Sequence, residues 1–478
     1  MPGTRITLAR NSRQTVRSAV VLDLDASNPE ESIRSILAAA EKKLRIKKPQ
    51  RLFLAADGTE IGPATLSRVA NDAVVLVSAG EGFVGGGNLS SKDGDQAPAA
   101  AVSVVHSSER FLEDFVERLA IDQLEQVARL PGVVKAVGMP DLHPSDHYPI
   151  GAAIESEECI YPVLIGGDVG CGMALFQTTL SSSTRPKRIC DKLQGIEGRW
   201  KDGSLSEWLA KNGISASSST PFDESLGTIG GGNHFAEIQQ VERVEDPVSF
   251  SALGLHEDKL VLLVHSGSRG LGKHIAHSQP VQLRENTPEF DAYMQQHNYA
   301  CNWARTNRDL IAHRIMTCLS SDPDASASKV LDIWHNNVTN KEIDSRSVWL
   351  HRKGAAPSDQ GAVVIPGSRG SFSYLVMPVG DQRENSFSLA HGAGRSLTRG
   401  VALTRMKNKA STVNAAAAAL QETRLGGRVI CEDVNLLFEE APEAYKDVDA
   451  VVGELVGCGI IKVVAVYRPV VTYKKRSE

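Results

Sequence analysis

The chain has 478 residues, of which 41% are hydrophobic and 23% are charged, and its formal net charge is −5. That length and apolar content are enough for one large domain with a full core and one smaller domain. The negative charge excludes a protein that attracts nucleic acid with its whole surface, so any such contact must come from local basic patches.

Cysteine usage and hydropathy indicate the compartment. The seven cysteines are scattered along the chain without paired short spacings, which argues against a disulfide framework and fits a reducing compartment. No apolar run reaches about 18 residues, and the first residues lack a signal-peptide pattern. We therefore expect a soluble intracellular protein, cytoplasmic or nuclear, that does not engage a membrane.

The first 82 residues are predicted to form a small domain. Asn28 is placed to cap a helix, with Pro29 at its first position and Glu31 in its first turn. The order strand, strand, helix, strand, strand resembles a ubiquitin-like ββαββ roll. The helix is expected over residues 29–44, the strands over residues 5–10, 18–24, 52–54 and 74–77, and a turn at Asp57-Gly58 between the last two strands.

No cluster of catalytic residue types occurs in residues 1–82, which favours a binding or regulatory role. A stabilising extension of the main domain is the alternative. Residues 83–101 are rich in glycine, serine and alanine and are predicted to be a flexible linker.

The larger domain is expected over residues 102–478. Apolar residues recur at helical spacing from Ser107 until Pro131-Gly132 breaks the pattern, which predicts a helix whose apolar stripe belongs to the core. Strand-like runs at residues 259–264 and 460–466 alternate irregularly with helices. The pattern predicts a mixed α+β fold without a dinucleotide-binding or P-loop motif.

Four short glycine-rich runs carry residues that can do chemistry. Residues 166–173 contain Asp168 and Cys171, and the other runs, residues 230–235, 264–270 and 390–395, contain His234, His265 and His391. Glycine and serine let the backbone approach a ligand closely and let its N–H groups face phosphate oxygens. We interpret the four runs as parts of one metal and phosphate site.

The residue types of these runs favour a transition metal. Thiolate, imidazole and carboxylate together suit a borderline ion such as manganese or zinc, whereas magnesium and calcium prefer all-oxygen shells. Taken singly, a cysteine or histidine is more often a core residue than a ligand. The candidate ligands are Asp168, Cys171, His234, His265 and His335.

These runs, with Met139-Pro140-Asp141-Leu142-His143 and residues 333–337, resemble the RtcB family of RNA ligases over roughly residues 102–474, in the family's motif order. The resemblance implies an RtcB-type α+β catalytic domain that uses GTP and manganese. It would join RNA ends bearing a 3′-phosphate or a 2′,3′-cyclic phosphate to 5′-hydroxyl ends. It further implies that Cys171 bridges two Mn²⁺ ions, that the other four ligands are distributed between them, and that Asp141 lies near the metals.

By the same resemblance, His391 is the nucleophile. A neutral imidazole nitrogen that attacks the α-phosphorus of GTP makes a phosphoramidate carrying GMP. The GMP would then pass to the RNA 3′-phosphate, and the 5′-hydroxyl would displace it. A cyclic end would first be opened by hydrolysis.

The resemblance also assigns binding residues. Tyr445 would stack on the guanine base. Arg269 would hold the RNA terminal phosphate, because its planar fork matches phosphate oxygens. The expected guanosine contacts are Asn233, Glu237, Ser373, Ala393, Gly394, Tyr445 and Lys474, and a suggested basic RNA track comprises Arg352, Lys353, Arg369, Arg395, Arg399 and residues 405–409.

Two other functions stay open. A metal-dependent RNA phosphoesterase would cleave the phosphates without joining ends and would not need His391. A non-catalytic RtcB-like scaffold would use the N-terminal domain to recruit a partner. The sequence does not identify that partner and leaves room for a separate activating protein.

Overall fold

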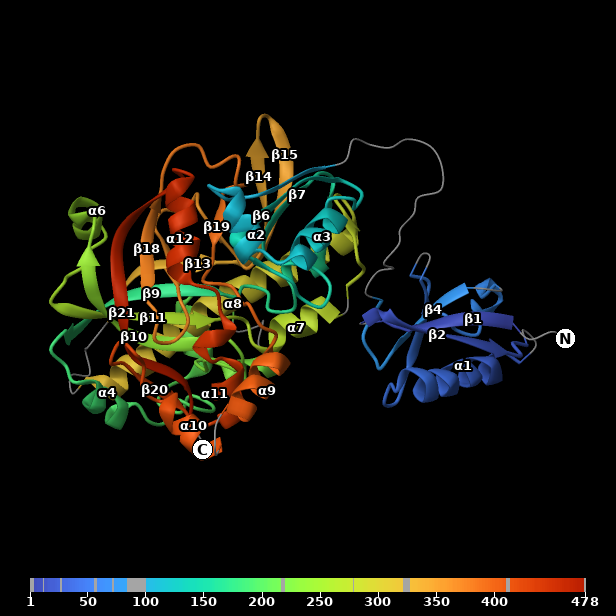
Figure 1. Ribbon diagram of the computed structural model, residues 1–478, viewed down its shortest axis with the longest axis horizontal. Coiled ribbons are helices and arrows are strands. Elements are labelled where there is room, and N and C mark those ends of the chain that lie inside the picture. The colour runs from blue at the N-terminus through green and yellow to red at the C-terminus, as the bar shows by residue number, and fades with distance from the viewer. Residues whose placement is uncertain are drawn as a thin grey trace. The chain divides into compact units, whose positions relative to one another are not determined.

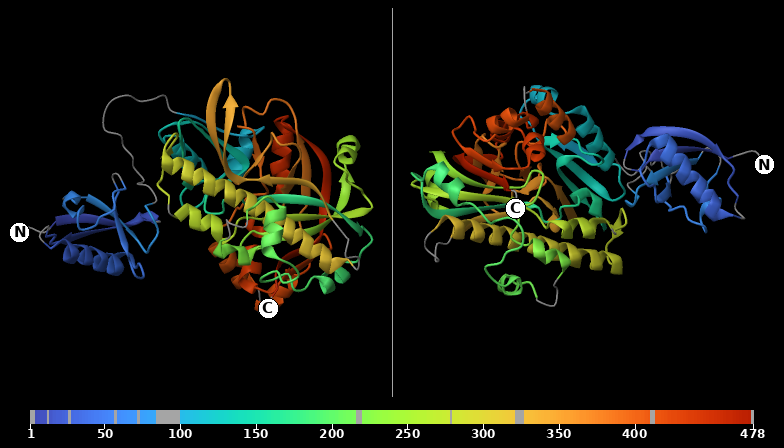
Figure 2. Two further views of the ribbon diagram at one scale, coloured as in Figure 1. Left: turned by 180° about the vertical axis from the view of Figure 1, so that it is seen from behind. Right: turned by 90° about the horizontal axis from the view of Figure 1, so that it is seen from below.

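The computed structural model describes residues 4–11, 13–25, 28–55, 58–70, 73–83, 100–215, 220–277, 279–320, 327–409 and 413–476. The chain divides into two compact units, one formed by residues 1–98 with 277–282 and the other by residues 99–276 with 283–478. Figures 1 and 2 show both units. Among the described helices, none combines the length and the apolar content needed to span a bilayer.

The N-terminal unit contains the five elements that the sequence predicts. Its sheet has the strand order β2-β1-β4-β3, in which β1 and β4 are parallel and the other neighbours are antiparallel. The elements are β1 (Thr4–Arg10), β2 (Arg13–Leu22), α1 (Pro29–Leu44), β3 (Arg51–Leu54), the 3₁₀ helix η1 (Leu66–Arg68) and β4 (Ala73–Ser78). Helix α1 buries Ile36, Ala40 and Leu44 in one core with the inward strand residues Ile6, Leu8, Leu52, Val75 and Val77.

Two details differ from the sequence prediction. Asn28 is the N-cap of α1, but its side-chain amide donates to Glu31 Oε2 at 2.7 Å instead of capping a backbone N–H. Phe83, predicted as the first linker residue, packs on the unit, with its ring centroid 5.8 Å from that of Phe53. The rest of the predicted linker up to residue 99, and Asp57 of the predicted turn, lie outside the described residues.

The larger unit is built on a mixed sheet. Among its described residues, eight strands form this sheet in the order β13-β9-β11-β10-β21-β18-β17, with β20 paired in parallel to β21. The strands are β9 (Gly172–Ser181), β10 (Phe235–Val244), β11 (Lys259–Ser266), β13 (Ser328–Trp334), β17 (Val363–Pro366), β18 (Ser373–Pro378), β20 (Arg428–Cys431) and β21 (Ile461–Lys475). The predicted strands at 259–264 and 460–466 correspond to β11 and the first part of β21.

A second sheet has the order β14-β15-β7-β6-β5. It comprises β5 (Ala101–Val104), β6 (Val133–His143), β7 (Ile150–Ser156), β14 (Asn336–Ile343) and β15 (Arg346–Lys353). Two short pairs complete the strands: β8 (Cys159–Ile160) with β12 (Leu283–Arg284), and β16 (Ala355–Pro357) with β19 (Ser388–Ala390).

Helices lie around these sheets. They are α2 (Glu109–Phe115), α3 (Arg118–Val127), α4 (Pro186–Lys192), α5 (Leu205–Lys211), α6 (Pro247–Ala252), α7 (Gly270–His277), α8 (Pro288–Leu319), α9 (Arg399–Lys409), α10 (Val413–Ala419), α11 (Val434–Glu439) and α12 (Val448–Gly457), with 3₁₀ helices η2 (Pro162–Ile165), η4 (Pro221–Ser225) and η5 (Pro442–Ala444). The helix predicted after Ser107 is two helices, α2 and α3, because Val116 and Glu117 between them adopt extended backbone angles.

The central strands are buried on both faces. On β11, Leu262 and Val264 belong to the core shared with α8, whereas Val261 and Leu263 belong to the core shared with β6, β15 and α12. Side chains alternate between the two faces of a strand, so a continuous apolar run is what a doubly covered strand requires. Helix α8 crosses one face of the sheet (Figure 2).

Candidate metal centre and adjoining pocket

Four candidate ligands lie at one end of four adjacent strands. Cys171 directly precedes β9, His234 directly precedes β10, His265 is the next-to-last residue of β11, and His335 directly follows β13. The strands are neighbours in the order β13-β9-β11-β10 and run antiparallel, so starts and ends alternate at the same edge. This register brings together residues that are far apart in the sequence.

Gly172 permits the closest of these approaches. A Cβ atom at Gly172 would lie 2.0 Å from the carbonyl oxygen of Ile333, so a larger residue would force β9 and β13 apart. Beside it, the backbone N–H of His335 donates to the carbonyl oxygen of Cys171 at 2.9 Å. Glycine at position 172 therefore allows the chain segments that carry Cys171 and His335 to lie close enough for this backbone hydrogen bond.

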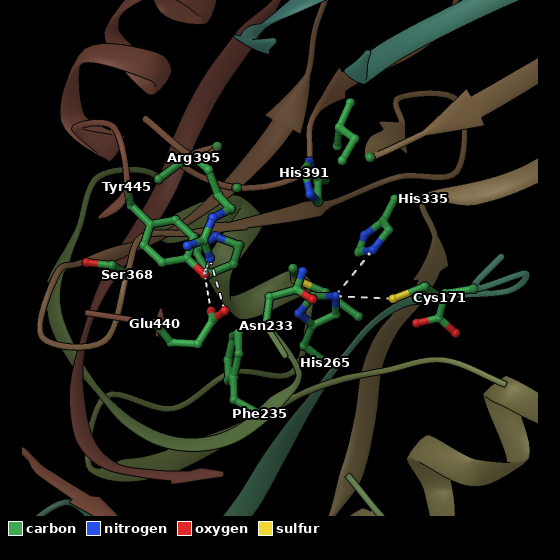
Figure 3. A pocket seen from close by; sticks show the side chains of 18 of the residues that line it. Cys171, Asn233, Phe235, His265, His335, Ser368, His391, Arg395, Glu440 and Tyr445 are labelled. Atoms are coloured by element: carbon green, nitrogen blue, oxygen red, sulfur yellow. Dashed lines mark hydrogen bonds and ion pairs between the residues drawn. The ribbon is translucent and has the colours of Figure 1, made fainter. Parts of the chain in front are cut away.

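All five candidate ligands meet in space. The sulfur of Cys171 lies 3.3 Å from Nε2 of His234 and 3.3 Å from Nε2 of His265. Nε2 of His265 lies 3.3 Å from Nε2 of His335, and Nε2 of His234 lies 2.8 Å from Oδ2 of Asp168. Figure 3 shows Cys171, His265 and His335 facing one another. The residues form a continuous series, and the His234 and His265 rings also contact each other directly, with centroids 5.1 Å apart.

The protonation states suit a metal ion. Burial and the neighbouring imidazoles hold the pKa of His265 well below 6.5, and burial with the charge of His391 does the same for His335. Their ring nitrogens are therefore neutral and can offer a lone pair. Burial, reinforced by Asp168, raises the pKa of the Cys171 thiol well above 9, so an ion that binds sulfur must displace its proton.

The spacing also fits. With metal–sulfur and metal–nitrogen bonds of about 2.3 and 2.1 Å, ligand atoms at angles between about 90° and 109° lie roughly 3.1 to 3.6 Å apart. The 3.3 Å separations around Cys171 fall in this interval. Cys171, His234 and His265 form a group whose ligand atoms all lie within 4.8 Å of one another, with Asp168 beside His234 and His335 beside His265.

His391 lies beside the ligand cluster, directly after β19. Its ring is 4.8 Å from the ring of His335 between centroids. Asp141, fully buried on β6, contacts His391 twice: Oδ2 is 2.7 Å from Nδ1 and accepts the backbone N–H at 3.2 Å. An ionised Asp141 holds the ring proton on Nδ1 and leaves the lone pair on Nε2. Asp141 is thus linked to the ligand cluster indirectly, through His391.

A pocket of about 300 Å³ joins the ligand cluster to a second group of polar residues. Arg395 and Tyr445 gather around Glu440 on the side of the pocket away from Cys171 (Figure 3). The predicted residues that line the pocket are Asp168, Cys171, Asn233, Glu237, His265, His335, His391, Ala393, Gly394, Tyr445 and Lys474.

Four predicted residues lie outside this lining set: Asp141 and His234, which are described above, and Ser373 and Arg269. Ser373 on β18 is buried, and its Oγ accepts from Nε2 of Gln239 at 2.7 Å, while the same amide donates to Glu237 Oε1 at 2.8 Å. Ser373 thus reaches Glu237 through Gln239. Arg269 follows β11 and donates to Thr228 Oγ1 at 3.3 Å.

Glu237 is a buried acid at the wall of the pocket. Burial raises its pKa to about 7, although Thr472 and Gln239 donate hydrogen bonds to its two oxygens. Lys474 lies near it and donates to the carbonyl oxygen of His234 at 3.1 Å. A carboxylate in this position can accept hydrogen bonds from a bound ligand that carries two adjacent N–H donors on one edge.

Sequence reasoning missed several lining residues. Glu440 accepts from Tyr445 Oη, and its Oε1 lies 3.0 Å from Nη1 of Arg395. Asn336 donates to the carbonyl oxygen of Asp168 at 3.3 Å and accepts the Gly354 N–H at 2.8 Å. The only signal for Asn336 was its place next to His335, and Glu440 had no signal of its own.

The suggested basic track stays a prediction, and two of its arginines are buried, with Arg369 in the wall of the pocket. Arg352 is 1% exposed and donates to Ser388 Oγ at 3.0 Å, and Arg369 is 7% exposed and donates to the Leu437 carbonyl oxygen at 2.5 Å. Arg352 also donates to the carbonyl oxygen of Phe387 at 3.0 Å, so acceptors inside the protein replace water around its guanidinium.

Comparison with known proteins gives a consistent result. The sequence matches the family described as "tRNA-splicing ligase RtcB" over residues 123–204, 201–281 and 277–475. It is 46% identical over 365 residues to the RNA-splicing ligase RtcB2 of Escherichia coli, covering 75% of this chain and 93% of that protein. It is 31% identical over 460 residues to the tRNA-splicing ligase RtcB of Thermococcus kodakarensis, covering 76% and 93%. For the tRNA-splicing ligase RtcB of Aeropyrum pernix, the identity is 30% over 469 residues, covering 79% and 96%.

The cluster predicts metal binding that depends on pH. Titration with Co²⁺ should produce a thiolate-to-metal absorption band that Cys171→Ser abolishes and that Cys301→Ser, a change at another buried cysteine, leaves intact. Because binding displaces the proton of a thiol whose pKa is raised, the binding constant should rise by up to about tenfold per pH unit between pH 6 and 8. A band that survives in Cys171→Ser would contradict this reading.

Proposed function

Because the chain belongs to the RtcB family of tRNA-splicing ligases, we propose that it is an RNA ligase that joins 2′,3′-cyclic phosphate or 3′-phosphate ends to 5′-hydroxyl ends, using GTP and two Mn²⁺ ions. The observation that carries the proposal is the convergence of five candidate ligand side chains beside His391, four of which line one pocket with it. A phosphoesterase or a scaffold would not need a histidine held in this way.

We divide the candidate ligands into two sets, one for each ion. Asp168, Cys171 and His234 would bind one ion, and Cys171, His265 and His335 the other, with the sulfur shared. Bound manganese would neutralise phosphate oxygens and so make phosphorus easier to attack.

His391 would act as the nucleophile. Asp141 keeps the proton on Nδ1, so Nε2 can form a bond to the α-phosphorus while the bond to the β-phosphate oxygen breaks and pyrophosphate leaves. The guanylate would move from His391 to the RNA 3′-phosphate. The 5′-hydroxyl oxygen would then attack that phosphorus, losing its proton, and GMP would leave. A cyclic phosphate would first be opened by water in the same pocket.

The far end of the pocket suits guanosine. Glu237 could accept the two adjacent donors of the guanine edge, with Lys474 beside it, and Tyr445 could stack on the base. Asn233, Ala393 and Gly394 line the same pocket and could contact the ribose and phosphates. Ser373 would contribute indirectly, by fixing Gln239 and through it Glu237.

Arg269 is proposed to hold the RNA terminal phosphate. Its guanidinium lies against Gly230, where an added Cβ would be 1.7 Å from Nη1, and the charge of Asp168 acts on it. Burial lowers the pKa of Arg269, but arginine stays charged at neutral pH. A cation placed beside the first ligand set could receive a phosphate bound there.

The N-terminal unit is proposed to be a ubiquitin-like binding domain over residues 1–82, joined to the ligase domain at 102–478 by the linker at 83–101. The support is its strand order with a central parallel pair and one packed helix. Its protein partner, a separate activating protein and a cytoplasmic location stay predictions.

The nucleophile can be tested by mass spectrometry. After incubation with GTP and Mn²⁺, the protein should carry a GMP adduct on His391, and His391→Ala should abolish both the adduct and RNA sealing while metal binding persists. His256→Ala, at an exposed histidine, is the matched control. Removal of RNA phosphates without any adduct would instead favour the phosphoesterase, and absence of both activities would favour the scaffold.

Glu237 should make GTP binding pH-dependent. Its pKa of about 7 means that the acceptor form is present above neutral pH and is lost below it, so the Kd for GTP should rise towards tenfold per pH unit between pH 7 and 6. Glu237→Gln should weaken binding by about 1.5 to 3 kcal/mol at pH 8 and remove this component of the pH dependence. Isothermal titration calorimetry measures both; identical pH profiles for the two proteins would rule out the assigned contact.

The role of the N-terminal unit can be separated from catalysis. A chain reduced to residues 100–478 keeps β5 and every proposed site residue, so it should seal a short RNA pair at a rate within about twofold of the full chain. Complete loss of sealing would show that the N-terminal unit belongs to the catalytic machinery.

A further inference from the structure

A buried arginine on helix α8 lies behind the ligand cluster. The Arg308 side chain is fully buried, and Nη1 donates to the carbonyl oxygens of Gly170 at 3.1 Å and Ser266 at 2.9 Å. Nε and Nη2 both donate to Oδ1 of Asp332, at 3.0 and 2.5 Å. One guanidinium therefore joins three separate segments of the chain.

Each of these segments carries one ligand of the same set. Gly170 directly precedes Cys171, Ser266 directly follows His265, and Asp332 lies on β13 three residues before His335. Cys171, His265 and His335 are the second ligand set described above. Gly170 also lies two residues after Asp168, whereas the segment that carries His234 accepts no hydrogen bond from the Arg308 guanidinium in the described part of the chain.

Packing alone does not explain an arginine here. Burying a guanidinium is costly unless its donors are paired, and a buried ion pair often stabilises a fold no better than apolar residues of similar volume. What an apolar residue cannot do is bind two carbonyl oxygens and a carboxylate at once. Lysine, with a compact ammonium instead of a planar fork, would also not span the three acceptors in this arrangement.

We propose that Arg308 is a positioning residue that sets the spacing of Cys171, His265 and His335 and thereby the affinity of one of the two metal ions. The inference rests on the two-ion site of the proposed function. It assigns to α8, which contributes none of the five ligands, a stronger influence on the set that contains His265 and His335 than on the set that contains His234, since Cys171 belongs to both.

The test is the number and affinity of Co²⁺ ions bound, measured by titration calorimetry and by the thiolate-to-metal absorption band. The variant Arg308→Met with Asp332→Asn removes the guanidinium and the carboxylate that faces it, and so also ends the ion pairs of Asp332 with Lys329 at 3.4 Å and Arg305 at 3.9 Å. It should bind the ion of the His265 and His335 set about 10- to 100-fold more weakly and lose much less affinity for the other ion, with a changed absorption band at saturation.

The matched control is Arg314→Met. Arg314 is also a buried arginine of α8, and it donates to the carbonyl oxygens of Gly195, Gly198 and Gly227, none of which adjoins a ligand. It should bind both ions normally. If the double variant does not fold by circular dichroism, Arg308→Lys replaces it, with the same selective loss expected.

Unchanged binding of both ions in the folded Arg308 variants, or equal losses in the Arg308 and Arg314 variants, would overturn the inference. Failure of the two-ion site itself is detected separately by Cys171→Ser. If that variant still binds two ions with normal affinity, the proposed ligand sets are wrong, whatever Arg308 does.

Discussion

The register of four antiparallel strands is the constraint on which the site depends. Phe235 of β10 and Met173 of β9 are both paired with His265 of β11, and Trp334 of β13 is paired with Gly172. Because side chains alternate along a strand, a slip of one residue would turn His265 from the cluster towards the core under α8. The two apolar cores that cover β9 and β11 make such a slip costly. The packing that fixes the strand register therefore also fixes the positions of the candidate ligands.

The same arrangement accounts for the chemistry. Imidazoles buried side by side stay neutral, and a thiol buried beside a carboxylate stays protonated until a cation arrives. The cluster thus presents nitrogen and sulfur atoms that can coordinate a divalent ion. Next to it, Asp141 gives His391 a fixed orientation, and the pocket continues to Glu237 and Tyr445 without interruption. On the proposed function, one cavity would hold the metal ligands, the nucleophile and the residues that bind the base.

Local patterns predicted the local features well. The helix over residues 29–44 and the four strands around it followed from periodicity and from Pro29, and the candidate ligands, which lie together in the structure, were found from glycine-rich runs that resemble a known family. Features that depend on tertiary contacts were missed or misjudged. Arg352 and Arg369 read as surface charges, since nothing local indicates the internal acceptors that bury them. Likewise, Arg308 lies in an ordinary helical stretch, and only the fold reveals the three carbonyl and carboxylate partners behind the cluster.

Anomalous diffraction from a crystal of the full chain grown with Mn²⁺ tests the central claim most directly. The account predicts two manganese peaks on either side of the Cys171 sulfur, one also contacting Asp168 and His234 and the other His265 and His335. A single peak, or peaks that do not touch the sulfur, would contradict it.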